Sequence, residues 1–433
     1  MRKIFLLFLG LAIASCTSET EKIEASENPI SQHLDAYFTA LTDLKEFNGV
    51  ILAFKNDSLI LDKAYNLFPN PNSSTYVSTE SQFDIHSVAK LMTHYLIVKL
   101  EEEGRLSEED PINRFFPDFP KGDQITVKML LDHSSGLPRE LLDLEGNEFD
   151  LEPSEIVALA KKQPLLFEPG EDAQYSNVGY ELLYEVISQI YGKPFSQCVV
   201  DEIFVPLKMD HSGAHFYTNN KRLENPAKNH VLQDTSLVQV PNILEDEFKT
   251  ARFYSTAADL DRFLKALEKE PYASVLKNEA GVIAKDGGSK GIRAQVYTDL
   301  EKDFRFVLLA NYDEMPFFKT IEDVSKILDS ELVEIPKELN RVAIEVEPDI
   351  LEQYVGSYSF ADFDGLILRV EMEENGIAVF QDNEKIGFLM AESPTVFFEN
   401  PKEPESFEFI PNEEGSYDVM MGWKGISVKG KRL

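Results

Sequence analysis

The 433-residue sequence has few cations for its size, and this shortage excludes several classes of partner. Its 42 lysines and arginines are outnumbered by 76 aspartates and glutamates, which gives a formal net charge of −34. A protein that binds nucleic acid needs a basic face that replaces counterions, so this balance argues against a nucleic-acid partner. It also argues against electrostatic docking on anionic lipid.

Cysteine is nearly absent, since only Cys16 and Cys198 occur. Cys198 lies among apolar residues at helical spacing, which favours a core position over a catalytic one. Hydrophobic residues make up 43% of the chain and aromatic residues 11%, enough to build a sizeable core and to exclude disorder. The length allows about two or three domains.

The N-terminus predicts export. Residues 1–15 combine the basic pair Arg2 and Lys3 with an apolar run that is too short to span a bilayer. The run ends in Ile13-Ala14-Ser15-Cys16, which resembles the lipobox of bacterial lipoproteins, where the cysteine is acylated and becomes the new N-terminus. The plainer alternative is a secretory signal with a chance cysteine. We expect an exported lipoprotein of the cell envelope, anchored to the membrane at Cys16.

Cleavage before Cys16 would remove two cations and bring the charge to −36, and no intrachain disulfide could form. Residues 16–29 read as a flexible tether. Patterns of apolar spacing and turn residues then predict helices over 29–47, 87–103, 256–270 and 321–328, a hairpin over 49–65, and strands around 281–311. We expect one domain over 30–330, a Pro-containing linker over 331–348, and a small antiparallel β domain over 349–433.

Ser87-Val88-Ala89-Lys90 is the first pattern that could carry chemistry. It places a serine and a lysine on one face at the start of a predicted helix. The lysine amine can then take a proton that an unaided hydroxyl cannot lose. The spacing recurs at Ser274 and Lys277, and for a lone copy we favour a helix cap with a solvated lysine.

Tyr175-Ser176-Asn177 is the second pattern. A tyrosine near cations can share the role of general base, and an amide two residues on can bind a substrate carbonyl. The simpler reading of Tyr175 is a half-buried loop aromatic. The spacing also recurs, at Tyr217-Thr218-Asn219.

Lys285-Asp286-Gly287-Gly288 is the third pattern. Glycines allow a strand to approach a ligand closely, and a cation there steadies a developing anion or a substrate carboxylate. The simpler reading is a glycine-rich hairpin turn. Similar short patterns occur at Lys385-Ile386-Gly387 and His211-Ser212-Gly213.

In order and with their flanks, these patterns resemble the serine β-lactamase-like family over about residues 30–330. That family includes class C β-lactamases, D-alanyl-D-alanine carboxypeptidases and small-ester hydrolases. The segments that carry the resemblance are FDIHSVAK, ITVKMLLDHSSGLP, FEPGEDAQYSNVGYELL, IFVPLKMDHSG, FYSTAADLDRFL and DGGSKGIRA followed by FRFVLLANY.

The resemblance implies a mixed α/β fold, in which helices flank an antiparallel sheet and a helical lobe is inserted after the first hairpin and helix. It implies that Ser87 attacks a carbonyl while Lys90 and Tyr175 manage its proton. The backbone N–H groups of Ser87 and Gly288 would form the oxyanion hole.

Asn177 and Lys285, with Gly287 beside them, would position the acyl-enzyme, and no metal or cofactor is needed. His133 in LLDHSSGL matches a family motif, with a structural role expected. The expected substrate is a small molecule or peptide with an ester, amide or D-amino-acid peptide carbonyl. The segment LEQYVGSYSF resembles the start of lipocalin-like C-terminal extensions of some members.

Two departures narrow this interpretation. Arg252 stands where many members have glycine before an aromatic-Tyr-Ser-Thr-Ala stretch, which predicts a cation near the pocket rim. No deacylating glutamate of the class A type can be assigned, so peptidase or esterase activity is favoured over true β-lactamase activity. A cluster of Lys90, Lys285 and Arg252 in an acidic protein favours neutral or anionic substrates.

Two other functions stay open at this point. The first is a catalytically inactive protein of this fold that binds a ligand or partner, for which Arg252 and the acidic surface are the reasons. The second is a structural envelope lipoprotein in which the motifs are coincidental.

Overall fold

The structure is a computed structural model that describes residues 28–142, 144, 151–214, 223–233, 236–240, 252–363, 366–413, 415–423 and 426–433. The predicted signal with Cys16, almost all of the predicted tether, and the repeated pattern at Tyr217–Asn219 lie outside these residues. Within the described part of the chain, no helix is both long and apolar enough to cross a membrane.

The first domain is built on an antiparallel sheet with the strand order β2-β1-β10-β9-β8. The strands are β1 (Gly49–Lys55), β2 (Ser58–Tyr65), β8 (Val282–Ser289), β9 (Ile292–Asp299) and β10 (Phe304–Ala310). The predicted hairpin is confirmed, and Asn56 and Asp57 make its turn with φ values of 48° and 56°. β8 forms one edge of this sheet and lies against the turn that carries Ser87.

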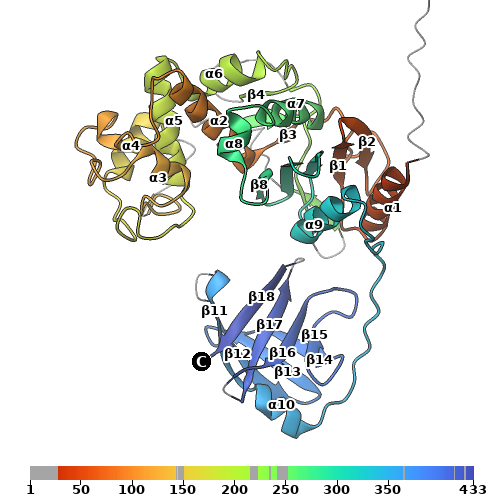
Figure 1. Ribbon diagram of the computed structural model, residues 1–433. Helices are drawn as coiled ribbons and strands as arrows, with labels where there is room; N and C mark the ends of the chain where they lie inside the picture. The colour runs from red at the N-terminus through yellow and green to blue at the C-terminus, as the bar shows by residue number, and fades with distance from the viewer. Residues whose placement is uncertain are drawn as a thin grey trace, which may run out of the picture.

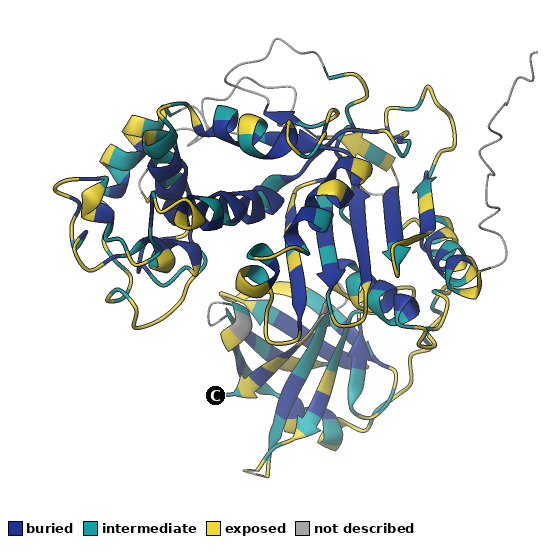
Figure 2. Cartoon of the chain, turned by 45° about the horizontal axis from the view of Figure 1, so that its top comes forward, coloured by how far each residue is buried: buried dark blue, intermediate teal, exposed yellow. Residues whose placement is uncertain are grey.

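Both faces of the sheet are covered, and alternate residues of one strand enter different cores. On β1, Val50 and Leu52 belong to one core, whereas Ile51 and Ala53 belong to the other. β1 and β10 therefore read as nearly continuous apolar runs; β10 is buried along its length and β1 over its first five residues (Figure 2). The helices that pack on the sheet are α1 (Pro29–Asp43) and α9 (Phe317–Leu328) on one face and α7 (Ala257–Leu267) on the other.

These helices confirm three of the predicted ones, with shifted ends. The first helix was expected to reach residue 47 but ends at Asp43, because Lys45 adopts a left-handed φ of 63° and Glu46 N–H donates to the Leu41 carbonyl. α9 begins at Phe317, before the predicted start at residue 321. The fourth predicted helix, over 87–103, is α2, which follows a single 3₁₀ turn.

A helical lobe is inserted between β2 and β8 (Figure 1). Its helices are α2 (Ala89–Glu102), α3 (Val127–Leu131), α4 (Pro153–Ala160), α5 (Asn177–Tyr191) and α6 (Phe195–Val199), with α8 (Tyr272–Leu276) after α7. Two small sheets join the lobe to the main sheet: β3 (Phe83–Asp84), β7 (Phe253–Ser255) and β4 (Gly213–Ala214), and the pair β5 (His230–Gln233) and β6 (Ser236–Gln239).

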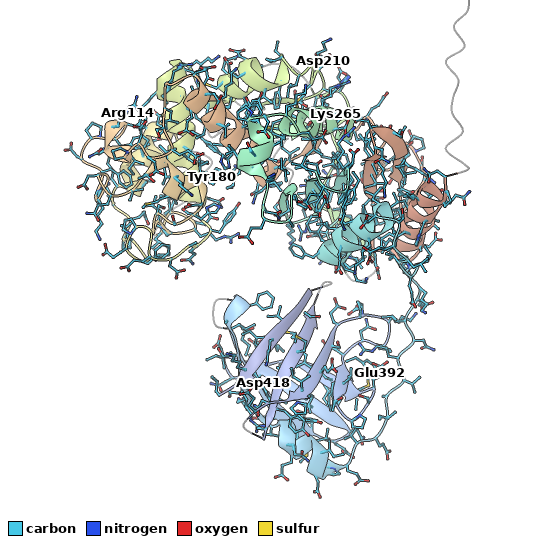
Figure 3. The ribbon with its side chains drawn as sticks, in the orientation of Figure 1. Arg114, Tyr180, Asp210, Lys265, Glu392 and Asp418 are labelled. Carbon is cyan, nitrogen blue, oxygen red and sulfur yellow. The ribbon has the colours of Figure 1, made fainter. Side chains whose placement is uncertain are left out.

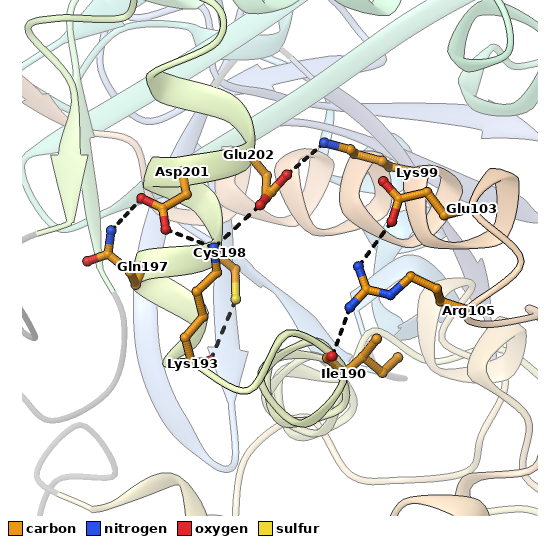
Figure 4. A network of polar contacts seen from close by, with 9 residues as sticks. All are labelled: Lys99, Glu103, Arg105, Ile190, Lys193, Gln197, Cys198, Asp201 and Glu202. Atoms are coloured by element: carbon orange, nitrogen blue, oxygen red, sulfur yellow. Dashed lines mark hydrogen bonds and ion pairs between the residues drawn. The ribbon is translucent and has the colours of Figure 1, made fainter.

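Cys198 lies in the core of this lobe, as its spacing predicted. It is fully buried, and burial raises the pKa of its thiol to about 12. An ion-pair network lies beside it, in which Lys193 and Lys99 both bind Glu202 (Figure 4). A protonated thiol enclosed in this way is a packing group rather than a nucleophile.

The C-terminal domain is a closed antiparallel barrel of eight strands, preceded by α10 (Pro348–Tyr354). Its strands are β11 (Gly356–Phe360), β12 (Leu366–Glu373), β13 (Gly376–Gln381), β14 (Glu384–Ala391), β15 (Val396–Phe398), β16 (Ser406–Pro411), β17 (Tyr417–Trp423) and β18 (Ile426–Arg432). Each strand pairs with the next, and β11 pairs with β18 to close it. This up-and-down topology is that of lipocalin barrels. The fold class expected from the sequence is thus confirmed for both domains.

The linker is tied to the barrel along part of its length. Arg341 binds the Glu392 carboxylate at 2.7 Å, and Ile344 N–H donates to the Ala391 carbonyl (Figure 3 labels Glu392). Inside the barrel, Tyr354 of α10 stacks on Phe409 at a centroid distance of 4.1 Å. The short helix α10 therefore contributes side chains to the barrel core.

Candidate active site

Ser87 lies in the 3₁₀ turn His86–Val88 that leads into α2. This turn is fixed from behind, because Ile85 N–H donates to the Phe253 carbonyl and Asp84 Oδ1 accepts from His86 N–H at 2.9 Å. Lys90 follows in the first turn of α2 with only 7% of its surface exposed. The helix start therefore places the serine and the lysine on one side, as their spacing predicted.

Tyr175 joins this pair from a distant part of the chain. Its hydroxyl lies 2.9 Å from Ser87 Oγ, and Lys90 Nζ lies 3.4 Å from the same oxygen. Tyr175 stands directly before α5, whose N-cap is Ser176; the Ser176 hydroxyl accepts from Gly179 N–H. The start of α5 is thus fixed facing the start of α2.

Asn177, the first residue of α5, extends the contact to a carboxylate. Its Oδ1 accepts from Lys90 Nζ at 2.8 Å, and its Nδ2 donates to Glu140 Oε1 at 2.7 Å. Its backbone N–H donates to the Arg139 carbonyl at 2.9 Å. A continuous polar chain therefore runs from Ser87 through Lys90 and Asn177 to Glu140.

The edge strand β8 brings the third pattern against the same turn. A Cβ on Gly287 would lie 2.6 Å from the Ile85 carbonyl oxygen and 2.8 Å from the Ser87 backbone nitrogen. Only glycine allows an approach this close. Gly288 is the next residue of β8.

Three cations face the ring of Tyr175. Lys90, Lys285 and Arg139 lie 5.1, 5.3 and 5.1 Å from its centroid. The ring centroid of a second tyrosine, Tyr180 of α5, lies 5.2 Å from Lys90 Nζ (Figure 3 labels Tyr180). Clustered cations of this kind favour negative charge that develops on a reacting oxygen.

The pKa of Lys90 is lowered to about 8. Burial is the main cause and the charge of Arg252 the second, whereas Glu181 and Glu140 oppose the shift. At pH 7 roughly one such lysine in ten is neutral, against about one in several thousand for an unperturbed lysine. The amine is thereby able to accept a proton near neutral pH.

Arg252 thus lies within electrostatic reach of the predicted site. Its charge also counteracts burial in setting the pKa of Glu181, which burial raises. Sequence reasoning proposed Arg252 as a cation at the pocket rim but did not find Glu181 or Glu140. The cations of this site are therefore accompanied by carboxylates.

His133 holds the backbone beneath Tyr175. Its Nδ1 accepts from Ser176 N–H at 3.1 Å, and its ring lies 4.5 Å from that of Tyr175. Burial, with the charges of Lys285 and Lys90, lowers the pKa of His133 to about 4, which keeps the ring neutral and Nδ1 free to accept. These contacts are those of a structural group, the role expected from the sequence.

The repeated short patterns that fall within the described residues lie elsewhere. Ser274 lies on α8, and its hydroxyl donates to the Glu270 carboxylate and to the Pro271 carbonyl. Lys385 pairs with Glu373 in the barrel. The Ser212 hydroxyl lies 2.7 Å from that of Ser255, at the end of β7. Among the copies that the structure describes, only those chosen by their flanks converge on one another.

Glu140 is the main residue that sequence reasoning missed. It carries no motif of its own, and its contact with Asn177 spans 37 residues of chain. His86 was also missed; its Nε2 lies 3.0 Å from the Ser289 hydroxyl at the end of β8. Over the described residues, no group of three or more His, Cys, Asp or Glu side chains is placed to hold a metal ion.

The family model for Beta-lactamase matches residues 34–324, which is most of the chain. The chain therefore belongs to the β-lactamase family of serine hydrolases. The match begins in α1 and ends in α9, so it covers the sheet and the helical lobe and stops before the barrel.

Relatives with curated descriptions agree with this assignment. Penicillin-binding protein 4* of Bacillus subtilis (strain 168) is 25% identical over 446 residues, covering 89% of this chain and 97% of that protein. Teichoic acid D-alanine hydrolase of Staphylococcus aureus (strain MRSA252) is 24% identical over 253 residues, 58% of this chain and 61% of that protein. The second match thus spans less than two thirds of the relative.

The fold of both domains recurs in a solved structure. The octameric penicillin-binding protein homologue from Pyrococcus abyssi matches with a TM-score of 0.62 and 19% identity, and the match covers 93% of this chain and all of that one. At this identity the likeness is one of fold. It includes the region of the barrel, which the family model does not reach.

Proposed function

We propose that the protein hydrolyses a D-alanyl ester, amide or peptide through an acyl-enzyme on Ser87. The observation that carries this proposal is the convergence of Tyr175 and a low-pKa Lys90 on one serine oxygen. A hydroxyl at its ordinary pKa needs such a neighbouring base to become a nucleophile. The name of one relative, the teichoic acid D-alanine hydrolase, supports the D-alanyl part.

In the proposed reaction, Ser87 Oγ attacks the substrate carbonyl carbon while its proton passes to the neutral amine of Lys90 or to Tyr175 in its phenolate form. The backbone N–H groups of Ser87 and Gly288 would hold the oxyanion, and such a donor typically contributes on the order of 10²- to 10³-fold in rate. The tetrahedral intermediate collapses as the leaving alcohol or amine takes the proton. Water then attacks the acyl-enzyme and releases the acid.

Lys285 and Asn177 would position the substrate. Lys285 is half-buried on β8 and faces Tyr175, so it can pair with the carboxylate of a D-alanyl-D-alanine peptide. Asn177 Nδ2 has a second hydrogen beyond the one given to Glu140, and that hydrogen can reach a substrate carbonyl. In this scheme, the role of Arg252 is to lower the pKa of Lys90 through its positive charge.

A labelling experiment tests the proposal. A fluorophosphonate or a fluorescent penicillin should label the wild-type protein and Ser274→Ala, but not Ser87→Ala. Ser274 is the matched control because it has a lysine at the same spacing and lies outside the site. Equal labelling of Ser87→Ala would refute the assignment. Absence of labelling and turnover in every form, with saturable ligand binding, would favour a non-catalytic binding protein.

We further propose that the protein is an exported lipoprotein held at the cell envelope through Cys16. The proposal is supported by the residue order of the N-terminal segment, where a basic pair, a short apolar run and small residues precede Cys16. Metabolic labelling with an alkyne fatty acid should modify the wild-type chain and not Cys16→Ala. Labelling of both would refute the anchor.

A further inference from the structure

A cavity of about 890 Å³ is lined by one end of the barrel and by two loops of the first domain. One loop follows α1 and contributes Glu46, and the other follows β10 and contributes Tyr312 and Glu314. Its lining includes none of the residues assigned to the Ser87 site. The volume falls in the range of small-molecule pockets.

The floor of this cavity is apolar and lies within the barrel. Leu368, Val379 and Leu389 line it, are 3 to 6% exposed, and belong to the barrel core. Phe407 and Met421 stand beside them on β16 and β17. The cavity is therefore the open mouth of the barrel, and an apolar group that enters it is removed from water.

The rim is acidic. Among the residues that line the cavity, two are lysines and five are glutamates, namely Glu46, Glu314, Glu399, Glu403 and Glu405. One of the lysines, Lys402, is bound to Glu338 at 2.7 Å. Burial, with the charges of Glu405 and Glu403, raises the pKa of Glu46 to about 7. These like charges repel one another, so a cation placed among them is favoured.

Tyr312 is a second and independent pointer to a ligand. It lines the cavity and is 1% exposed, and its hydroxyl makes no hydrogen bond within the described residues. Burial is the main cause that raises the pKa of Tyr312, and the charges of Glu314, Asp313 and Glu46 add to it. A buried hydroxyl is normally hydrogen-bonded, and an ammonium group could donate to this one.

We propose that this cavity binds a small amphipathic amine, whose alkyl or aryl body enters the barrel mouth and whose ammonium lies among Glu46, Glu314 and the Tyr312 hydroxyl. The apolar floor favours a ligand with an alkyl or aryl group, and the acidic rim favours a positive charge on its polar end. An anionic amphiphile of the same size would bring its charge against five carboxylates. The site is separate from the proposed hydrolytic site, and either can be right without the other.

A charge series of one fluorophore tests this proposal on the full-length protein. Dansylcadaverine carries an ammonium, its N-acetyl form is neutral, and dansyl-6-aminohexanoate is anionic. Fluorescence titration should give saturable one-to-one binding of the cation, at least tenfold tighter than that of the other two. Equal affinity for all three would overturn the proposal, as would binding that is lost once Ser87 is blocked by a fluorophosphonate.

Variants locate the site. Glu46→Gln and Tyr312→Phe should each weaken dansylcadaverine binding at least fivefold, while Glu352→Gln, an exposed glutamate on α10, should leave it unchanged. Thermal melts show whether each variant is folded; if Tyr312→Phe is not, Glu46→Gln and Glu314→Gln decide the question. Affinities in these variants equal to that of Glu352→Gln would overturn the proposal.

Discussion

The hydroxyl of Tyr175 lies 2.9 Å from Oγ of Ser87, although 88 residues separate the two in the chain. The contact forms because the N-termini of α2 and α5 lie side by side. Ser87 precedes the first of these helices and Tyr175 precedes the second. Lys90 reaches the same oxygen from α2. A serine flanked by two potential bases is the arrangement on which the following predictions depend.

The pH dependence of acylation should follow Lys90. Since its pKa is lowered to about 8, the neutral amine increases as the pH rises, and kcat/KM should rise through about pH 8 and then level off. Arg252→Gln removes a positive charge that lowers this pKa, so the rise should move to higher pH. Arg114→Gln, a surface arginine of the helical lobe labelled in Figure 3, is the control and should not move it. A shift to lower pH in Arg252→Gln would contradict this account.

Glu140 should act in the opposite direction. Its charge raises the pKa of Lys90, so Glu140→Gln should move the rise in kcat/KM to lower pH while the new amide still accepts from Asn177. Glu140→Ala also loses that hydrogen bond and should reduce kcat by about fivefold, from a loss of about 1 kcal/mol. If the pH profiles of kcat/KM for both variants coincide with that of the wild type, Glu140 has no influence on the reaction.

Gly287 should tolerate no side chain. Gly287→Ala places a methyl group 2.6 Å from the Ile85 carbonyl, which pushes β8 away from the Ser87 turn. A displacement of this kind costs on the order of 10²-fold in kcat/KM. Gly179→Ala on α5 is the matched control, because its added Cβ meets neighbours only at 3.5 Å or more. Similar rates for the two alanine variants would argue against the close approach.

Cys198 should affect stability and leave catalysis unchanged. Cys198→Ala removes a buried sulfur, so it should lower the free energy of unfolding by about 1 kcal/mol and leave kcat/KM at the wild-type value. In a Cys16→Ser background, a thiol reagent should react with Cys198 only after denaturation, because burial raises its pKa to about 12. Rapid reaction in the native protein would show that the lobe opens around it.

The fold and most of the site could be predicted from the sequence, because both depend largely on patterns of residues that are neighbours in the chain. The hairpin at Asn56-Asp57, the serine-lysine spacing and the glycines of β8 each depend on neighbours in the chain. The order and flanks of the motifs then separated Ser87 from Ser274. What could not be predicted depends on pairs that only the tertiary fold brings together.

Glu140 illustrates this limit. Nothing around it in the sequence indicates a functional residue, and its role follows from the path of a loop toward Asn177. Barrel closure is similar, since it depends on the pairing of Tyr358 with Arg432 across the whole domain. The predicted preference for neutral or anionic substrates rested on cations alone. The carboxylates of Glu140 and Glu181 now enter that balance, and the preference stays a prediction.

Intact-mass spectrometry during turnover tests the central claim most directly. After a brief incubation with a D-alanyl ester or a D-alanyl-D-alanine peptide, the wild-type protein and Ser274→Ala should gain the mass of one acyl group that disappears as product forms. Ser87→Ala should gain none and should not release product. An adduct of the same mass on Ser87→Ala, or product released by that variant at the wild-type rate, would contradict an acyl-enzyme on Ser87.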